Sequence, residues 1–499
     1  MADWQNDIDK LLAEKNSDKQ AELIKKIAKA KPYWQEVVEY LEKVSFSPVE
    51  KKGIILRSAK CIDSIERPYV LYIPPAYNPQ EAAPLFVYLH GGVSRGNIAD
   101  NPIDYAKENP FLKLAKQNKW LMVFPMGQAG ATWWDKVGMA NIKNIVRTIK
   151  SEFNIDDDRV WMGGFSDGAS ASFLHAMVAP SDYAAFIALN GHMGVGSEDG
   201  GLPTYAPNFY NTPLYAVTTD KDGLYPTHTM RPTIDMAIDA GGKVLYRELE
   251  GTHSFSYADK EFPLIANFLK RHPRNPFPTS IVWETALREF GLCRWFAIDK
   301  VAISQPAPWH IDYNAAMIDS TITIGFIPSD FEDTIGVKID RVVDGDYLAS
   351  RIGLQAGDII IRGNKMSIET MADLVAFKAG LSRGDFVEIT VSRDNQEVPL
   401  HGYLPEPKNY NLFIREQPSA MAKVQFASNR IDITQSRLGA FRVLIHPDMM
   451  RLDQNLVIKV NDKDVYNNKV EPDIGYILKN FLKNRDRKLL YINEVKIEL

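Results

Sequence analysis

Cysteine is scarce in this sequence, with Cys61 and Cys293 as the two cysteines among 499 residues. A disulfide-stapled fold needs a denser cysteine framework, so both are expected to be buried thiols. The sequence contains no C-x-x-C pair and no clustered histidines and cysteines, so no metal site is expected.

An excess of charge of one sign and a long apolar run are also missing. The formal net charge is −5, and the sequence pI is about 6.1, so no nucleic-acid partner is expected. No apolar run approaches the roughly 18 residues of a membrane span. The first residues are neither basic nor apolar, which predicts a cytoplasmic protein, or a periplasmic or secreted one if Met1 replaces a removed signal peptide.

The length predicts several domains. Residues 1–50 are expected to be helical, because apolar side chains recur there at helical spacing on three successive faces. We expect this segment to cap the domain that follows.

Residues 51–275 alternate short apolar runs with helix-compatible stretches. Continuous apolar strands separated by helices predict an α/β fold with a mostly parallel sheet covered on both faces. The expected strands are 69–73, 85–89, 120–124, 160–162, 186–189, 214–217 and 244–249. A proline-rich stretch at 272–278 marks the end of this domain.

The remainder is predicted to be rich in β-strands. Residues 276–320 form a β-rich segment that is expected to pair with a C-terminal β-rich domain at 405–499, which has one helix at about 473–483. Residues 321–404 between them form a separable unit.

The most informative motif is Gly164-Phe165-Ser166-Asp167-Gly168, between an apolar run and a helix-compatible run. A serine in G-x-S-x-G at such a junction is typical of a nucleophile elbow, where small residues let strand and helix approach. The pattern predicts a serine hydrolase with Ser166 as the nucleophile.

In hydrolases of this kind an acid and then a histidine follow the serine along the chain. Asp220 and Asp222 both follow the apolar run 214–217, and His253 follows the run 244–249. His253 is the predicted base, which would take the Ser166 proton and return it to the leaving group.

The turn His90-Gly91-Gly92-Val93 follows another apolar run. Glycine lets a backbone N–H reach a substrate oxygen, so Gly92 is the expected first oxyanion donor, with Val93 as the alternative. The N–H of Asp167 is the expected second donor. This chemistry needs water alone as second substrate, so no cofactor is expected.

Three further side chains are candidates for contact with substrate. Trp133 and Trp134 would line an acyl or alcohol pocket or, equally well, pack in the core. His192 follows an apolar run and is a candidate to face the pocket.

Together these motifs resemble the poly(3-hydroxybutyrate) depolymerase and feruloyl esterase group of α/β hydrolases. The likeness covers roughly residues 65–272 and includes Arg67–Pro74, Leu89–Gly92, Trp133-Trp134 and Ile155–Val160. It implies hydrolysis of a carboxylic ester through an acyl-enzyme. It also favours Asp222 over Asp220, because Asp-x-x-x-Pro at 222–226 is similar to the acid loop of these hydrolases.

Residues 321–404 resemble a PDZ domain, most closely those of bacterial HtrA-type proteases. The likeness rests on Gly336–Ile339 and on Leu348–Ile360 with its Gly-Leu-x-x-Gly-Asp-x-Ile pattern. Ile324-Gly325-Phe326 is similar to the carboxylate-binding loop of those domains. The resemblance implies a peptide C-terminus as a partner, unless the unit only shapes the entrance to the hydrolase.

The leading interpretation is therefore a serine carboxylesterase with Ser166, His253 and Asp222 as catalytic residues. Its expected substrates are small-molecule or polysaccharide-linked esters, such as feruloyl or acetyl groups of plant cell walls. One alternative is a serine peptidase of the prolyl-oligopeptidase type. Another is a scaffold with an inactive hydrolase domain and a peptide-binding PDZ domain.

Overall fold

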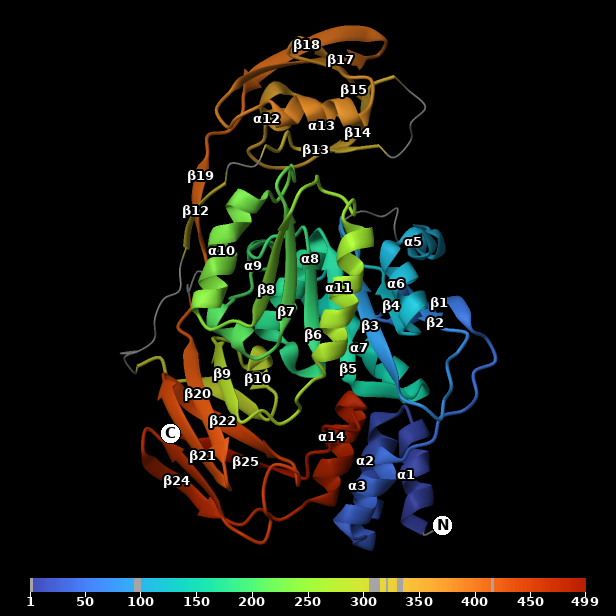
Figure 1. Ribbon diagram of the computed structural model, residues 1–499, viewed down its shortest axis with the longest axis vertical. Coiled ribbons are helices and arrows are strands. Elements are labelled where there is room, and N and C mark those ends of the chain that lie inside the picture. The colour runs from blue at the N-terminus through green and yellow to red at the C-terminus, as the bar shows by residue number, and fades with distance from the viewer. Residues whose placement is uncertain (1–2, 94–99, 305–314, 320–321, 330–334, 414–416) are drawn as a thin grey trace.

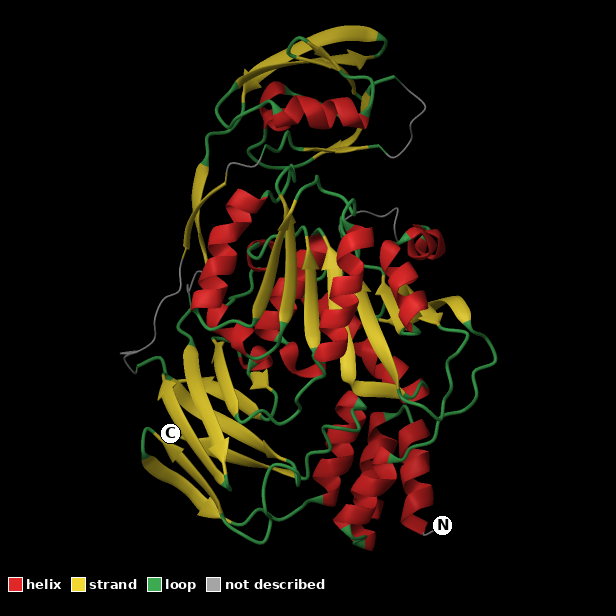
Figure 2. Ribbon diagram, viewed as in Figure 1, coloured by secondary structure: helices red, strands yellow, loops and turns green. Residues whose placement is uncertain are grey.

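The computed structural model describes residues 3–93, 100–304, 315–319, 322–329, 335–413 and 417–499. Three regions follow one another along the vertical axis of Figure 1. A small β unit lies at the top, a helix-covered sheet in the middle, and a second β-rich region with a group of helices at the bottom (Figure 2).

The middle region is an α/β unit built on an eight-stranded sheet of order β1-β2-β4-β3-β5-β6-β7-β8. The first two strands pair in antiparallel fashion, and the neighbours from β4 to β8 are parallel. The strands are β1 (Gly53–Lys60), β2 (Glu66–Ile73), β3 (Ala83–Leu89), β4 (Leu121–Pro125), β5 (Ile155–Phe165), β6 (Ala185–Leu189), β7 (Leu214–Thr219) and β8 (Val244–Leu249). This is the mostly parallel sheet that the sequence predicted.

Successive side chains of a strand point to opposite faces of the sheet. An apolar cluster covers each face of this sheet. In β3, Leu85 and Val87 face one cluster, and Phe86 and Tyr88 face the other. The first cluster is completed by α7 (Lys136–Glu152), α8 (Asp167–Val178) and α10 (Thr227–Asp239). The second is completed by α5 (Pro102–Glu108), α6 (Pro110–Asn118) and α11 (Ala258–Arg271). Three short helices, η1 (Pro180–Asp182), α9 (Val195–Gly200) and η2 (Ala206–Tyr210), complete the unit.

The N-terminal residues form three helices, α1 (Asp3–Ala13), α2 (Ser17–Ala30) and α3 (Trp34–Glu42). Their buried side chains, among them Ile8, Ile27 and Leu41, belong to one cluster with the C-terminal strands and helix α14 (Ile474–Asn484). The expectation that they cap the following α/β domain is therefore wrong. Helical periodicity identifies an apolar face but not the surface that covers it.

The C-terminal region holds two sheets, of orders β10-β11-β22-β25 and β24-β23-β21-β20-β9. Strand β9 (Ser280–Thr285) pairs with β20, and β11 (Phe296–Val301) pairs with β22, so segments on both sides of the small β unit share these sheets. The other strands are β10 (Leu292–Cys293), β20 (Ala420–Ala427), β21 (Arg430–Ser436), β22 (Leu438–Ile445), β23 (Leu456–Val460), β24 (Lys463–Asn468) and β25 (Asn493–Glu498), and η3 (Arg288–Phe290) lies between β9 and β10.

The small β unit at the top has its own apolar cluster and is called the outer β unit here (residues 322–404). Its elements are β13 (Phe326–Pro328), β14 (Val337–Val342), α12 (Leu348–Ile352), β15 (Ile359–Gly363), β16 (Met366–Ser367), α13 (Met371–Ala379), β17 (Phe386–Arg393) and β18 (Gln396–Tyr403). A two-stranded connector, β12 (Ala315–Asp319) paired with β19 (Lys408–Leu412), joins it to the rest of the chain beside α10 (Figure 1). Its assignment as a PDZ domain stays a prediction.

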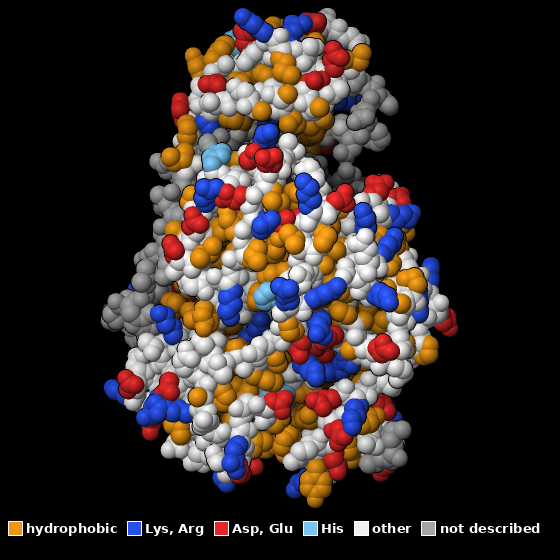
Figure 3. All heavy atoms as spheres, in the orientation of Figure 1, with side chains coloured by type: hydrophobic (Ala, Val, Ile, Leu, Met, Phe, Trp, Pro, Cys, Tyr) orange, Lys and Arg blue, Asp and Glu red, His pale blue; other side chains and the backbone are white. Residues whose placement is uncertain are grey.

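The described part of the chain contains no helix long and apolar enough to cross a bilayer. Within the same residues no group of three or more His, Cys, Asp or Glu side chains is arranged to hold a metal ion. Cys61 and Cys293 are both buried and unpaired with each other. On the face shown in Figure 3, acidic and basic side chains are interspersed.

Candidate active site

Ser166 lies at the junction of β5 and α8, with φ 58° and ψ −120°. A positive φ is costly for a residue with a side chain and persists only where the surroundings impose it. A Cβ on either Gly164 or Gly168 would overlap the carbonyl oxygen of Leu89 in the neighbouring strand β3. The glycines therefore permit the close strand–helix approach that forces the sharp turn at Ser166.

His253 and Asp222 lie together at the same edge of the sheet. Asp222 follows β7, His253 follows β8, and the His253 Nδ1 is 2.8 Å from the Asp222 Oδ2. The His253 ring also packs against Phe165, the residue before Ser166, with ring centroids 4.7 Å apart. The Asp222 side chain is fully buried, whereas 22% of the His253 side chain remains exposed. An exposed base held by a buried acid has the arrangement needed to exchange protons with a substrate.

Several donors hold the Asp222 carboxylate in place. Its Oδ1 accepts the N–H groups of Leu224 (2.8 Å) and Tyr225 (2.9 Å), and its Oδ2 accepts the Asn190 side-chain amide (2.8 Å). Burial alone would raise the pKa of Asp222, but His253 and these hydrogen bonds hold it below its ordinary value. The group therefore stays ionised at neutral pH and can stabilise a protonated histidine.

The alternative acid, Asp220, has a different partner. Its Oδ1 accepts the backbone N–H of Gly251 at 2.9 Å, and its side chain is exposed. Of the two carboxylates that the sequence offered, Asp222 is the one in contact with His253.

Asn190, at the end of β6, was not among the sequence candidates. Its amide nitrogen donates to Asp222 and to the Thr219 hydroxyl (2.7 Å), and its Oδ1 accepts the Tyr257 hydroxyl (2.6 Å). Asn190 is fully buried and has φ 53°. An Asn-Gly pair directly after a buried strand was the signal available in the sequence, since asparagine tolerates a left-handed turn.

The loop at 90–93 approaches Ser166 closely. A Cβ on Gly91 would lie 2.8 Å from the Ser166 Cβ, and Gly92 has φ 60°. The Val93 N–H donates to the Asp167 carboxylate at 2.9 Å, so this alternative oxyanion donor is already engaged. Gly92 and the Asp167 N–H stay the predicted donors.

His90 and Trp133 brace this loop from within. The His90 Nε2 accepts the Gly127 N–H (2.9 Å), and its Nδ1 donates to the Gly91 carbonyl (2.9 Å). Burial lowers the pKa of His90 to about 4, so the ring is neutral. Trp133 donates its indole N–H to the His90 carbonyl (2.9 Å). Trp133 and Trp134 are both buried in the core, and a role in substrate binding stays a prediction for both.

The Tyr225 ring is a neighbour of both His253 and His192. The Tyr225 ring centroid lies 5.9 Å from that of His253 and 5.9 Å from that of His192. Burial, and then the nearby carboxylates of Asp167 and Asp199, raise the pKa of Tyr225, so its phenol stays protonated. A role of His192 in substrate binding stays a prediction.

The predicted peptide-binding residues lie in the outer β unit. Ile324 is buried and its carbonyl accepts the Ala349 N–H (2.7 Å), Gly325 has φ 97° and packs on Tyr347, and Phe326 begins β13. Peptide binding by these residues stays a prediction.

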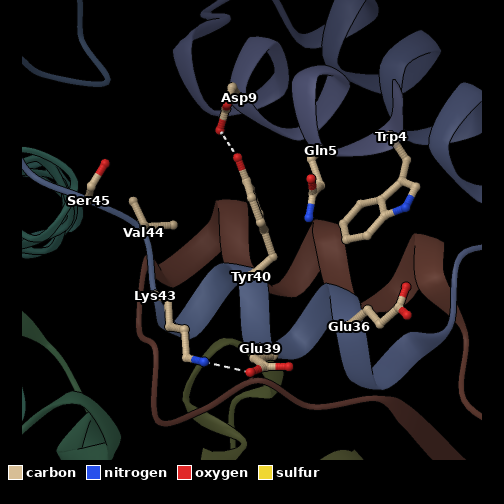
Figure 4. A pocket seen from close by; sticks show the side chains of 9 residues that line it. All are labelled: Trp4, Gln5, Asp9, Glu36, Glu39, Tyr40, Lys43, Val44 and Ser45. Carbon is tan, nitrogen blue, oxygen red and sulfur yellow. Dashed lines mark hydrogen bonds and ion pairs between the residues drawn. The ribbon is translucent and has the colours of Figure 1, made fainter. Parts of the chain in front are cut away.

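A separate cavity of about 780 Å³ lies between α1 and α3 (Figure 4). Trp4 and Tyr40 form adjacent walls, with ring centroids 5.8 Å apart. The Tyr40 hydroxyl donates to Asp9 (2.6 Å), and burial together with this bond raises the pKa of Tyr40 to about 12. The cavity is lined only by residues 4–45, so it shares no residue with the site around Ser166.

No family model matches the sequence. Over 111 residues the chain is 32% identical to a bifunctional acetylxylan esterase/xylanase of Neocallimastix patriciarum. This match covers 21% of this chain and 15% of that protein. The chain thus spans a small part of that relative.

Solved structures with similarity include a thermostable esterase, with 22% identity and a TM-score of 0.35 over 44% of this chain and 63% of that one. They also include a ferulic acid esterase, with 13% identity and a TM-score of 0.36 over 44% of this chain and 98% of that one.

Proposed function

We propose that residues 51–275 form a serine carboxylic-ester hydrolase with Ser166 as nucleophile, His253 as base and Asp222 as the acid that orients the base. One observation carries the proposal: the His253 Nδ1 lies 2.8 Å from a buried, ionised Asp222, at the sheet edge where the elbow at Ser166 ends β5. Such a pair beside an elbow serine is the arrangement that activates a hydroxyl.

The proposed reaction follows from this geometry. With its Nδ1–H donated to Asp222, the His253 ring presents the lone pair of Nε2, which takes the Ser166 proton as Oγ attacks the ester carbonyl. The N–H groups of Gly92 and Asp167 stabilise the tetrahedral oxyanion. The imidazolium then protonates the leaving alcohol, and water hydrolyses the acyl-enzyme by the same steps.

For the substrate we propose acetyl or feruloyl esters carried by plant polysaccharides. Support comes from the likeness to the bifunctional acetylxylan esterase/xylanase. In such a substrate the acyl group is esterified to a hydroxyl of the polysaccharide.

Ser166→Ala tests the proposal. We expect the rate of p-nitrophenyl acetate hydrolysis to fall at least about a thousandfold, because the nucleophile is gone, with an unchanged circular dichroism spectrum. Ser151→Ala, which alters an exposed hydroxyl on α7, is the matched control and should retain wild-type activity.

A fluorophosphonate probe and a substrate panel complete the experiment. The probe should label the wild-type chain and the Ser151→Ala variant but not Ser166→Ala. Hydrolysis of peptide anilides in preference to acetyl and feruloyl esters would identify a peptidase instead. A wild-type chain that is neither labelled nor active would refute the hydrolase.

A further inference from the structure

The connector that carries the outer β unit ends inside the core of the α/β unit. Leu412, the last residue of β19, and Phe413 are each 1% exposed and belong to the apolar cluster formed by the sheet with α7, α8 and α10. Leu404, only eight positions earlier, lies in the core of the outer β unit. A single short, mostly extended segment thus connects two apolar cores.

Leu412 makes its contact at residues 190–194, here called the site loop. A Cβ on Gly194 would lie 2.6 Å from the Leu412 Cδ1 and 3.1 Å from the His192 Cε1. The Gly194 N–H donates to the His192 Nδ1 at 3.0 Å. Leu412 therefore packs directly on the backbone that fixes the His192 ring.

The same loop contacts both the nucleophile and the acid. A Cβ on Gly191 would lie 2.8 Å from the Ser166 carbonyl oxygen and 2.6 Å from the Ser170 nitrogen, so the loop lies tightly against the start of α8. The His192 N–H donates to the Ser170 hydroxyl at 3.0 Å. At the other end of the loop, Asn190 donates to Asp222. A shift of the loop would therefore displace Ser166 and Asp222 relative to each other.

We propose that Leu412 is a positioning residue of the hydrolase site, supplied by the connector of the outer β unit rather than by residues 51–275. It acts through the site loop, which it holds against α8 and against Asp222. This inference rests on the proposed function, because it assigns Leu412 a role in that reaction.

A complementary pair of substitutions tests the contact in the full-length chain. Leu412→Ala opens space beside Gly194, and we expect kcat for p-nitrophenyl acetate to fall about tenfold, because the nucleophile and acid lose their alignment. Gly194→Ala places a methyl group against Leu412 and should lower kcat similarly. In the double variant the new methyl occupies the vacated space, so kcat should return to within about threefold of wild type.

The matched control is Ile318→Ala, on the partner strand of the same connector, where the side chain is 61% exposed. It should leave kcat unchanged. All rates are expressed per active site titrated with a fluorophosphonate, and thermal unfolding is measured in parallel. A side chain that merely stabilises the fold would change the unfolding temperature and the titratable fraction but not kcat per titrated site.

Each outcome decides between the two proposals. Wild-type kcat per titrated site in Leu412→Ala, or a double variant no faster than Gly194→Ala alone, overturns the positioning role while the hydrolase stands. A wild-type chain that neither hydrolyses the ester nor reacts with the probe overturns both.

Discussion

At the scale of single residues, the sharp turn at Ser166 depends on the lack of a Cβ at Gly164 and Gly168. Ser166 adopts φ 58° because the strand and helix on either side of it approach without intervening Cβ atoms. Gly168 lies directly against the Leu89 carbonyl, which is backbone and cannot turn aside as a side chain could. The G-x-S-x-G pattern is therefore a packing requirement as well as a motif.

Gly168→Ala should consequently destabilise the chain by about 3 kcal/mol or more, because the added methyl group forces the strand and helix apart. Chemical denaturation monitored by tryptophan fluorescence measures this loss. Gly223→Ala is the matched control, since a Cβ there meets no atom within 4 Å. Equal stability of the two variants would contradict the packing argument.

At the scale of elements, strands with continuous apolar sequence were predicted well. The run expected at 186–189 lies within β6 and the run at 214–217 lies within β7, two strands that are buried throughout. Strand β1 was missed, because its side chains are mostly exposed or half-buried at the edge of the sheet and its sequence lacks a long apolar run. The other edge strand, β8, was predicted at 244–249 although none of its residues is fully buried.

Helix α13 of the outer β unit shows how a local motif fixes an element's start. The Thr370 hydroxyl accepts the Asp373 N–H, and the Asp373 carboxylate accepts the Thr370 N–H (2.9 Å), a reciprocal capping box. Leu374 and Phe377 on this helix are buried in the core of the unit. The capping box therefore stabilises the first turn of α13, just before the residues that pack in the core.

Thr370→Ala should cost about 1 kcal/mol of local stability, since the Asp373 N–H loses its acceptor and the Asp373 carboxylate loses the hydroxyl donor. Hydrogen exchange should become roughly fivefold faster at the first amides of α13 that are protected in the wild type. Ser350→Ala in α12, whose exposed hydroxyl bonds weakly to Val343, serves as control. Unchanged exchange in α13 of the Thr370 variant would show that the cap does not limit its opening.

At the scale of the whole molecule, the C-terminal region is tied to the α/β unit by buried charges. Asp486 is fully buried and lies 2.8 Å from Lys150 of α7 and 2.8 Å from Arg274, which follows α11. Arg487 reaches back to the carbonyl of Ile155 at the start of β5. Lys150 also pairs with the buried Asp157 (3.0 Å) and Arg274 with Asp158 (3.0 Å), so Asp486 is the carboxylate that the two buried cations share.

Asp486→Asn should therefore lower the free energy of unfolding by about 1.5 to 3 kcal/mol, because Lys150 and Arg274 lose the charge of the carboxylate they share and keep only Asp157 and Asp158 as ionic partners. Differential scanning calorimetry would show a lower melting temperature. Asp453→Asn breaks an exposed pair with Arg451 and should cost at most about 1 kcal/mol. If the two variants have the same melting temperature, the buried network does not stabilise the assembly of the two regions.

By itself, the sequence determined the mostly parallel sheet and the order in which Ser166, Asp222 and His253 follow its strands, because apolar runs and turn residues act locally. Tertiary structure decided which distant segments meet. It placed the N-terminal helices on the C-terminal region, brought Asp222 rather than Asp220 to His253, and set Leu412 against Gly194. These contacts depend on how separate apolar surfaces pack, and no pattern within one segment encodes its partner.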